Sequence, residues 1–375
     1  MKLVIEPDDP ETAAAIERLR LGPPFEVIVA PEAGPRTKPK ALNAALPFAR
    51  GSFTVIYDAE DRPERDQLRR ALDMFLADTE LACVQAHLTI DNTADSWLTR
   101  FFTAEYAGQF DVFLPGLAAL RLPLPLGGSS NHFRTAALRK IGAWDPYNVT
   151  EDADLGMRLS RFSYRSGVVA SATYEEAPAL FKPWLRQRTR WFKGWMQTWL
   201  VHMRSPRRLF EDLGLGGFLT FQLAVGGNVL AALVYPIFLA GAAWQLVQQA
   251  PTGEGWVNGL LAGLHGTALV LGFSVAIIVG CIGLVRRGLI GTAWVLVLIP
   301  LHWLLLSLAA WRAIFQLLRD PYSWEKTEHG LARTSRLARM KRPTPVFPKR
   351  KATRAATSVP GPRIDLSSRR RLSKV

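Results

Sequence analysis

The sequence predicts an α/β domain followed by membrane-spanning helices and a basic tail. Strand-like and helix-like segments alternate over the first 90 residues. Residues 213–318 are strongly apolar, whereas residues 319–375 are polar and basic. Of the formal net charge of +14, the segment from Arg333 to Val375 carries +13, because it holds 14 lysines and arginines and one acid. The high charge is therefore a property of the tail and not of the α/β domain.

The α/β prediction follows from the order of the first elements. The expected strands cover Leu3–Ile5, Phe25–Ala30, Phe53–Tyr57 and Leu81–Gln85. The expected helices cover Ala13–Leu19, Lys38–Leu46 and Arg65–Leu76. Asp9 and Pro10 have the residue types that cap and begin a helix. Such alternation favours a mostly parallel sheet with helices on both faces, in which ligands bind at the carboxyl ends of the strands.

Two later stretches are long enough to span a bilayer, which needs ~20 apolar residues. They are Gly217–Gln245 and Asn258–Leu284, and the second stops at Arg286-Arg287, a signal typical of the cytoplasmic side. A third apolar stretch, Leu289–Leu318, is interrupted by Pro300. Three full crossings would place the basic tail outside. We therefore expect two crossings and a re-entrant or interfacial third stretch that bends at the proline.

The basic tail and the cysteines indicate the location of the protein. Basic residues beside apolar spans favour the anionic inner face of a membrane. Nucleic acid is not an expected partner, because only Phe347 lies among these basic residues, too few aromatics for stacking on bases. Cys83 and Cys281 lie in different settings, so no disulfide is expected, which suits a reducing cytosol. We expect a multi-pass protein of the inner (plasma) membrane with a cytoplasmic α/β domain.

Two charged segments lie at the ends of predicted elements. Lys38 and Lys40 begin a helix, where amines and the helix dipole favour diphosphate oxygens, although a solvated helix end is the simpler explanation when this segment is taken alone. Asp58, Glu60 and Asp61 follow a buried strand. Three acids this close repel one another unless a cation binds, and carboxylates suit Mg²⁺ or Mn²⁺. An ordinary polar loop remains the alternative.

A third segment, Thr150-Glu151-Asp152, precedes the predicted helix Ala153–Phe162. The helix dipole and free N–H groups keep a carboxylate ionised at such a position. An ionised carboxylate that faces a cleft accepts the proton of an attacking hydroxyl. Plain capping of the helix explains the same residues, and for this segment alone it is the simpler explanation.

The fourth segment is Gln187-Arg188-Thr189-Arg190-Trp191, in a long helix predicted from about Pro183 to Val201. At ~100° per residue, tryptophans gather on one face and basic residues on the other. The tryptophans are Trp184, Trp191, Trp195 and Trp199, and the basic residues are Arg186, Arg190 and Lys193. One explanation is an amphipathic helix at the bilayer surface. The other, compatible with it, is a sugar stacked on tryptophan and a phosphate bound by arginine.

The chain contains four motifs in a fixed order before its membrane helices: Lys-x-x-x-Leu-Asn, Asp-x-Glu-Asp, Thr-Glu-Asp and Gln-x-x-Arg-Trp. This ordered set resembles the processive family-2 glycosyltransferases, which include cellulose, chitin and hyaluronan synthases. The similarity covers roughly residues 2–330. It implies a GT-A catalytic domain. Asp152 resembles the catalytic base, positioned by Thr150 and Glu151. The donor diphosphate site of the family is matched by Lys38, Asp58, Gln187 and Arg190. Its metal site is matched by Asp58, Glu60 and Asp61, and its acceptor site by Trp191 and His132.

What the resemblance implies is inverting transfer of a sugar from a nucleotide-sugar donor, UDP-hexose by resemblance, to a growing polysaccharide. Mg²⁺ or Mn²⁺ is the expected cofactor. The expected partners are the donor, the glycan acceptor and the lipid bilayer, with room for a partner in export or in a synthase complex. Two alternatives stay open: a non-catalytic remnant of such an enzyme, and transfer of one sugar to a lipid phosphate.

The resemblance has one departure, at the beginning of the chain. Family members place a strand that holds the nucleotide base before the strand that matches Leu3–Ile5, so a start-truncated enzyme is expected. The expected domains are a GT-A-like domain over residues 1–205, amphipathic and transmembrane helices over 206–318, and a cytoplasmic segment with a disordered basic tail over 319–375.

Overall fold

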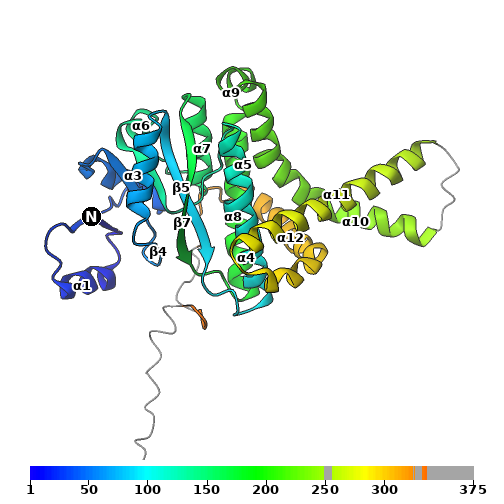
Figure 1. Ribbon diagram of the computed structural model, residues 1–375, viewed down its shortest axis with the longest axis horizontal. Helices are drawn as coiled ribbons and strands as arrows, with labels where there is room; N and C mark the ends of the chain where they lie inside the picture. The colour runs from blue at the N-terminus through cyan, green and yellow to red at the C-terminus, as the bar shows by residue number, and fades with distance from the viewer. Residues whose placement is uncertain (249–255, 324, 326–331, 336–375) are drawn as a thin grey trace, which may run out of the picture.

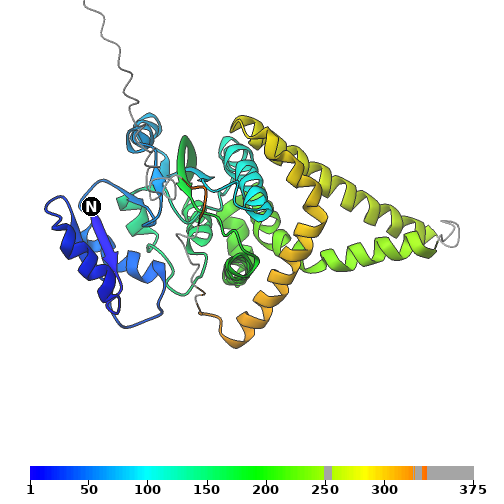
Figure 2. The same cartoon turned by 90° about the horizontal axis from the view of Figure 1, so that it is seen from below.

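The computed structural model describes residues 1–248, 256–323, 325 and 332–335. Its first unit is a parallel strand pair, β1 (Lys2–Ile5) with β2 (Glu26–Val29), joined by helix α1 (Pro10–Leu19). The side chain of Asp9 caps α1 by accepting a hydrogen bond from the backbone N–H of Thr12 at 3.0 Å, as predicted. This unit lies at the end of the molecule farthest from the long apolar helices (Figures 1 and 2).

The main sheet has five strands in the order β3-β6-β5-β7-β4. Their bounds are β3 Phe53–Ile56, β4 Arg62–Pro63, β5 Leu81–Ile90, β6 Asn131–Arg134 and β7 Arg165–Glu175. Only β5 and β7 pair in parallel; every other pair in this sheet is antiparallel. The prediction of a mostly parallel sheet is therefore wrong. The reason is that β6, which lies beyond the first 90 residues, inserts antiparallel between β3 and β5.

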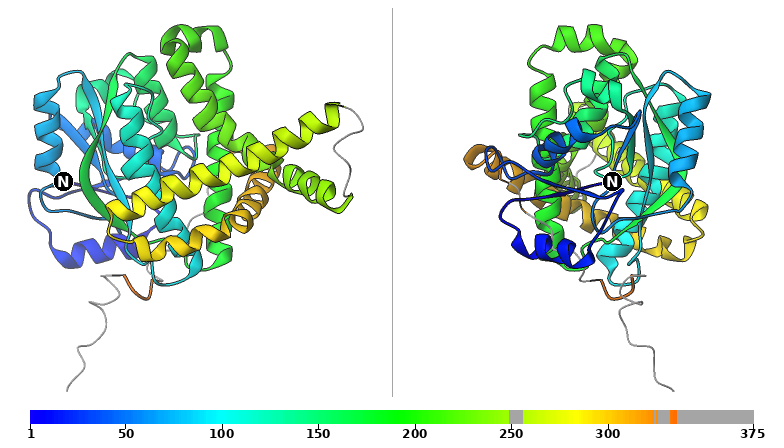
Figure 3. Two further views of the ribbon diagram at one scale, coloured as in Figure 1. Left: turned by 45° about the vertical axis from the view of Figure 1, so that its right-hand side comes forward. Right: turned by 90° about the vertical axis from the view of Figure 1, so that its left-hand side faces the viewer.

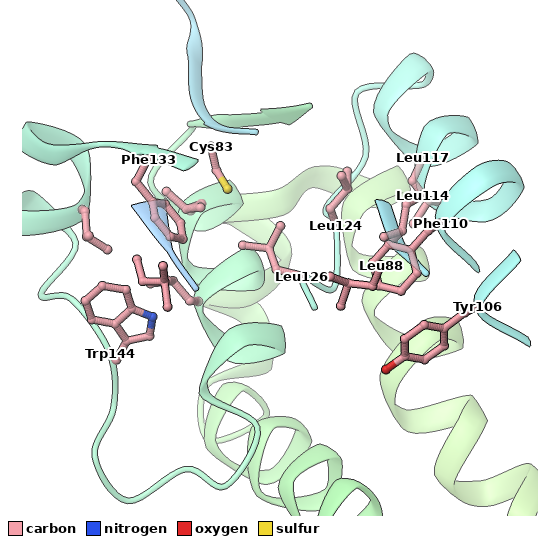
Figure 4. Packing of buried hydrophobic residues seen from close by; sticks show 14 of the residues in the cluster. Cys83, Leu88, Tyr106, Phe110, Leu114, Leu117, Leu124, Leu126, Phe133 and Trp144 are labelled. Carbon is pink, nitrogen blue, oxygen red and sulfur yellow. The ribbon is translucent and has the colours of Figure 1, made fainter. Parts of the chain in front are cut away.

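Helices cover this sheet, and an apolar core fills the space between them. Their bounds are α2 Lys38–Ala45, α3 Gln67–Ala77, α4 Trp97–Gly108, α5 Leu114–Ala119, α6 Thr135–Lys140 and α7 Glu151–Arg161. A short 3₁₀ turn, Leu46–Phe48, follows α2, and a π-helix, Gln109–Phe113, joins α4 to α5. The main core includes Phe110, Leu124 and Phe133 (Figure 4). The core fixes where the strand ends and helix starts meet.

The remaining helices form the apolar part of the molecule. They are α8 Phe181–His202, α9 Pro206–Phe221, α10 Asn228–Gln248, α11 Trp256–Arg286 and α12 Ile299–Arg319, with a π-helix at Gln222–Gly227 and a 3₁₀ helix at Ile290–Leu298. Within the described residues, three segments are long and apolar enough to cross a membrane: Pro206–Trp244, Ala262–Arg286 and Ile290–Arg319. Helices α10 and α11 project together away from the sheet (Figures 1 and 3).

The third apolar stretch is broken close to the predicted proline. A 3₁₀ segment ends at Leu298, and α12 begins at Ile299 with Pro300 in its first turn, where a missing N–H costs no helical hydrogen bond. The number of membrane crossings stays a prediction. From residue 336 on, the expected disordered tail lies outside the described residues.

Candidate active site

One cavity of about 1200 Å³ opens between the sheet domain and the apolar helices. It is reached by residues after β3, at the start of α7 and along α8, which lie far apart in the sequence. The predicted site residues that line it are Lys38, Asp58, Glu60, Thr150, Glu151, Asp152, Gln187, Arg190 and Trp191. Two predicted residues, Asp61 and His132, do not line it. The four predicted segments thus meet in one place.

Lys38 contacts both the acids that follow β3 and the backbone of Gly128, which also lines the cavity. Its ammonium group forms an ion pair with the carboxylate of Asp58 and donates a hydrogen bond to the carbonyl of Gly128 at 2.6 Å. Burial alone would lower the pKa of Lys38, but the carboxylates of Asp58 and Glu151 outweigh it and raise that pKa. Lys38 is therefore a firmly charged cation inside the cavity and not a solvated helix end.

The acids after β3 divide into two that line the cavity and one that does not. Asp58 and Glu60 line it. The Asp61 carboxylate instead accepts hydrogen bonds from the Asp58 N–H at 3.1 Å and from the Ser129 hydroxyl. Burial, followed by repulsion from Asp58, raises the pKa of Asp61 to about 7. Asp61 therefore stabilises the loop after β3 through hydrogen bonds outside the cavity lining.

The donor set of these acids decides whether they suit a metal. The described residues contain no group of three or more His, Cys, Asp or Glu placed to hold a metal by themselves. A Mg²⁺ or Mn²⁺ ion that also binds substrate phosphates needs only one or two carboxylates. Asp58 and Glu60 fit that requirement, because both face the cavity that would hold the diphosphate.

At the start of α7, Glu151 and Asp152 place two carboxyl groups in the cavity. Burial, followed by repulsion from Asp152, raises the pKa of Glu151 to about 7. Burial also raises the pKa of Asp152, whose Oδ1 accepts the Ala153 N–H at 2.8 Å. Thr150 occupies the N-cap position, but its side chain makes no capping hydrogen bond. Capping by the Thr150 side chain therefore does not explain the segment, whereas Asp152 accepts a hydrogen bond from an N–H of the first turn.

Helix α8 presents Gln187, Arg190 and Trp191 to the same cavity. Burial lowers the pKa of the Arg190 guanidinium, and the negative charges of Glu151 and Asp152 oppose this shift. The ring of Trp191 packs edge-on against Phe102, with 5.7 Å between the ring centroids. A cation and an aromatic ring thus line the same cavity as the two carboxyl groups of α7.

Helix α8 is buried in the protein over much of its length. Trp184 and Lys193 are both fully buried. The ammonium of Lys193 donates to the Ser323 carbonyl at 2.6 Å and to its hydroxyl at 3.0 Å. Lys193, predicted on the basic face of this helix, is thus buried against the segment that follows α12.

His132 is the predicted acceptor contact that the structure leaves outside the cavity. It lies in β6, between β3 and β5 of the main sheet, with its Nδ1 3.1 Å from the carbonyl oxygen of Val84. Burial lowers the pKa of His132, which favours the neutral imidazole. In this structure, His132 is part of the sheet and not of the cavity wall.

Sequence reasoning missed several residues that belong to the cavity. Glu175 and Glu176 lie at the end of β7 and line it, so the same argument from strand ends that found Asp58 applies to them. Arg188 forms an ion pair with Glu105 and lies over the Trp191 ring, 4.7 Å from its centroid. Nothing in the local sequence around Glu105 indicated this contact, because its partner lies 83 residues away.

The cavity brings together the segments on which the resemblance to family-2 glycosyltransferases rests: the acids after β3, the carboxyl pair at the start of α7 and the Gln-x-x-Arg-Trp motif of α8. The chain belongs to the family whose model is described as "Glycosyl transferase family group 2", which matches residues 53–319. The predicted GT-A-like domain followed by apolar helices is thereby confirmed.

Relatives and a solved structure agree with this family. The chain is 28% identical over 219 residues to a probable glycosyltransferase, YdaM, of Bacillus subtilis (57% of this chain, 52% of that protein). It is 29% identical over 223 residues to a beta-monoglucosyldiacylglycerol synthase of Synechocystis (56% of this chain, 45% of that protein). The chain spans about half the length of these curated relatives. The mannosyltransferase PcManGT from Pyrobaculum calidifontis, solved with GDP-Man and Mn²⁺, shares the fold with a TM-score of 0.52 at 19% identity, over 84% of this chain and 75% of that one.

Proposed function

We propose that this protein transfers a sugar, with inversion, from a nucleotide-sugar donor to an acceptor hydroxyl at the membrane. The observation that carries the proposal is that Lys38, Asp58, Asp152 and Arg190 line one cavity although they come from four separate segments. Cations suited to a diphosphate, acids suited to a metal and a buried candidate base stand together there. The proposed catalytic domain covers residues 1–205, in the cytoplasm, with multi-pass helices after it in the plasma membrane.

The donor half of the site is proposed to be the Lys38, Asp58, Glu60 and Arg190 side. Lys38 and Arg190 would bind the diphosphate of a UDP-hexose, with Gln187 beside them. Asp58 and Glu60 would hold Mg²⁺ or Mn²⁺, a choice supported by PcManGT, which was solved in complex with GDP-Man and Mn²⁺. When bound, the metal would neutralise negative charge that develops on the leaving diphosphate.

Asp152 is proposed as the general base, with Glu151 beside it. The acceptor O–H gives its proton to the Asp152 carboxylate as its oxygen forms a bond to the anomeric carbon. The bond from that carbon to the diphosphate oxygen breaks, and the electron pair leaves with the nucleotide diphosphate. Arg190, which lines the same cavity, stabilises the charge that this step creates.

A growing polysaccharide is the acceptor implied by the motifs, because Trp191 would stack against a sugar ring at the cavity wall. A lipid acceptor is the second candidate. The specific observation that favours it is that helices able to span a membrane line part of the same cavity. The Synechocystis relative, a beta-monoglucosyldiacylglycerol synthase, is named for a glycolipid product.

The test is sugar transfer by the purified chain in the presence of Mg²⁺ or Mn²⁺ with a panel of labelled UDP-sugars and GDP-mannose. We expect Asp152→Asn to lower the rate ~10²–10⁴-fold, the usual contribution of a general base. Asp73→Asn, at an exposed position of α3, is the matched control and should leave the rate unchanged. Full turnover by Asp152→Asn would remove the proposed base, and no donor turnover by the native chain would remove the proposed function.

A further inference from the structure

The cavity that holds the proposed catalytic residues has two halves of different chemistry. The half described above is charged. The other half is formed by α4, by the apolar helices α10, α11 and α12 and by the 3₁₀ segment Ile290–Leu298, and its lining is almost entirely aliphatic or aromatic. Representative residues of this apolar half are Ala231, Leu271, Val275, Val279, Leu296 and Trp303.

The apolar half is continuous with the catalytic half and open at the membrane helices. Asp152 and Val275 line the same cavity of about 1200 Å³. Val275 lies in a segment that is apolar and long enough to span a bilayer, and 57% of its surface is exposed. Gly272, Ala276 and Gly280 recur every four residues and therefore lie on one face of α11, where Trp303 packs against Gly272 and Leu296 against Gly280.

We propose that this apolar half binds the hydrocarbon chain of a lipid acceptor, and that the uncharged, hydroxyl-bearing head of this lipid reaches Asp152. The inference rests on the proposed function and names its acceptor class. A bare glycan chain fits the apolar half poorly, because sugar hydroxyls taken from water need hydrogen-bond partners that aliphatic side chains do not supply. A hydrocarbon chain needs none.

The charge balance of the cavity favours an uncharged head over a lipid phosphate. Among the described residues that line it, seven are acids and three are basic. The nucleotide diphosphate already brings negative charge into this cavity. A second phosphate from the acceptor would add to that charge where acids outnumber bases, whereas a neutral hydroxyl meets a proton acceptor in Asp152.

The transfer step is the one proposed above with a lipid hydroxyl as nucleophile. The hydroxyl proton passes to Asp152, the lipid oxygen bonds to the anomeric carbon, and the diphosphate leaves with the electron pair of the broken bond. The product is a glycolipid whose new sugar carries the next hydroxyl. Extension into a lipid-anchored glycan is thus compatible with the same site.

The experiment uses the purified full chain in phosphatidylcholine nanodiscs, with the labelled donor panel and three acceptors in separate arms. These are dioleoylglycerol, undecaprenyl phosphate and a soluble cello-oligosaccharide. We expect label in dioleoylglycerol. Label in undecaprenyl phosphate overturns the uncharged head, and label only in the oligosaccharide overturns the lipid acceptor. If no nucleotide is released in any arm, the proposed function is contradicted, and this inference is contradicted with it.

Two further measurements test the location of the chain-binding half. Val275→Trp should lower transfer to dioleoylglycerol at least 10-fold, because the indole would fill the cavity. The matched control is Ile277→Trp, on the other side of α11 and outside the cavity lining, which should stay within 2-fold of the native rate. A dioleoylglycerol analogue with a photoreactive acyl chain should crosslink the native protein at residues that line the apolar half, such as Ala231, Val275 or Trp303. Crosslinks elsewhere, or equal effects of the two variants, contradict the proposal.

Discussion

At the scale of single residues, the charges of the cavity depend on one another. Glu151 and Asp152 are adjacent acids in a buried position, and burial raises the pKa of both. Lys38 and Arg190 oppose this rise, since each favours the ionised carboxylates. Two neighbouring carboxyl groups with two cations nearby can share a proton near neutral pH. The pair, and not either acid alone, sets the pH at which a base is present.

We predict that transfer slows as the pH falls through about 7. A carboxyl group with a raised pKa binds its proton at a higher pH than usual, so the basic form is lost as the pH falls through that raised value. In Glu151→Gln, Asp152 loses a negative neighbour, so the acid limb of the kcat/KM profile should move to lower pH. Glu17→Gln, exposed on α1, should not move it. An acid limb that stays in place in Glu151→Gln would contradict this coupling.

We also predict that transfer depends on a divalent cation held by the acids after β3. Treatment with EDTA should abolish transfer, and added Mn²⁺ or Mg²⁺ should restore it. In Asp58→Asn, the Mn²⁺ concentration for half-maximal activity should rise at least ~10-fold, because even loss of a group behind a metal ligand costs about that much. The measurement is a Mn²⁺ titration of native, Asp58→Asn and Asp73→Asn proteins. Full activity of the native protein in EDTA would exclude the proposed metal.

At the scale of elements, α8 organises the site. Its Gly194 lies against the start of α7: a β-carbon there would be 2.7 Å from the backbone nitrogen of Thr150. The same helix carries Arg188, whose guanidinium lies 4.4 Å from the ring centroid of Phe102 and pairs with Glu105 of α4. One helix thus sets the positions of both the carboxyl pair and the tryptophan.

Gly194→Ala should therefore separate α8 from α7. Because the clash involves the backbone nitrogen of Thr150 as well as its short side chain, we expect a loss of about 1–3 kcal/mol in the free energy of unfolding and a lower transfer rate. Gly116→Ala in α5 is the control, since a β-carbon there meets no atom within 4 Å. Thermal unfolding and transfer rates of the two variants should differ. If Gly194→Ala melts and turns over like the native protein, the close packing is not needed.

Short sequence patterns predicted the first helices and strands well, but they did not predict how the strands pair in the sheet. Asp9, Pro10 and the apolar runs placed α1 and the first strands, because caps and strands depend on nearby residues. The position of β6 in the sheet depends on its pairing with β3 and β5, in which His132 lies opposite both Val55 and Val84. These partners are distant in the sequence, so no local pattern encodes the pairing. The burial of Lys193 escaped prediction for the same reason.

The candidate site was likewise predicted where local sequence sufficed and missed where contacts between distant segments decide. Acids at strand ends and helix starts were predicted, since their position in an element already indicates a cleft. His132 was predicted from its place in the motif order, but strand β6 keeps it outside the cavity. The apolar half of the cavity could not be foreseen, because it exists only where α4 meets α10 and α11.

At the scale of the whole molecule, the sheet domain and the apolar helices are joined by a close crossing. Helix α11 packs on α4 at Gly283, where a β-carbon would overlap the backbone of Ala107. Beyond it, Arg287 donates to Asp111 through Nε at 2.6 Å and through Nη2 at 2.8 Å. The sequence interpretation of Arg287 as a topology signal therefore omits a second role, as the anchor of α11 to the sheet domain.

This anchor gives the last prediction. Arg287 and Asp111 are both largely buried, and His87 approaches the same carboxylate, with its Nδ1 2.8 Å from Oδ1. Burial alone would raise the pKa of Asp111, but its hydrogen bonds with Arg287 and His87 lower it, so the ionised form is the stable one. In Arg287→Met, a buried carboxylate loses its main partner, which costs about 3–5 kcal/mol.

We expect Arg287→Met to lower the thermal unfolding temperature in detergent, whereas Arg69→Met on the exposed face of α3 should not. Adding Asp111→Asn to Arg287→Met should recover part of the loss, because the unpaired negative charge is then removed. Recovery in the double variant would show that the damage comes from the stranded carboxylate. If the double variant is less stable than Arg287→Met by the full cost of Asp111→Asn alone, the two side chains act independently and the apolar helices are held to the sheet domain by packing at Gly283 instead.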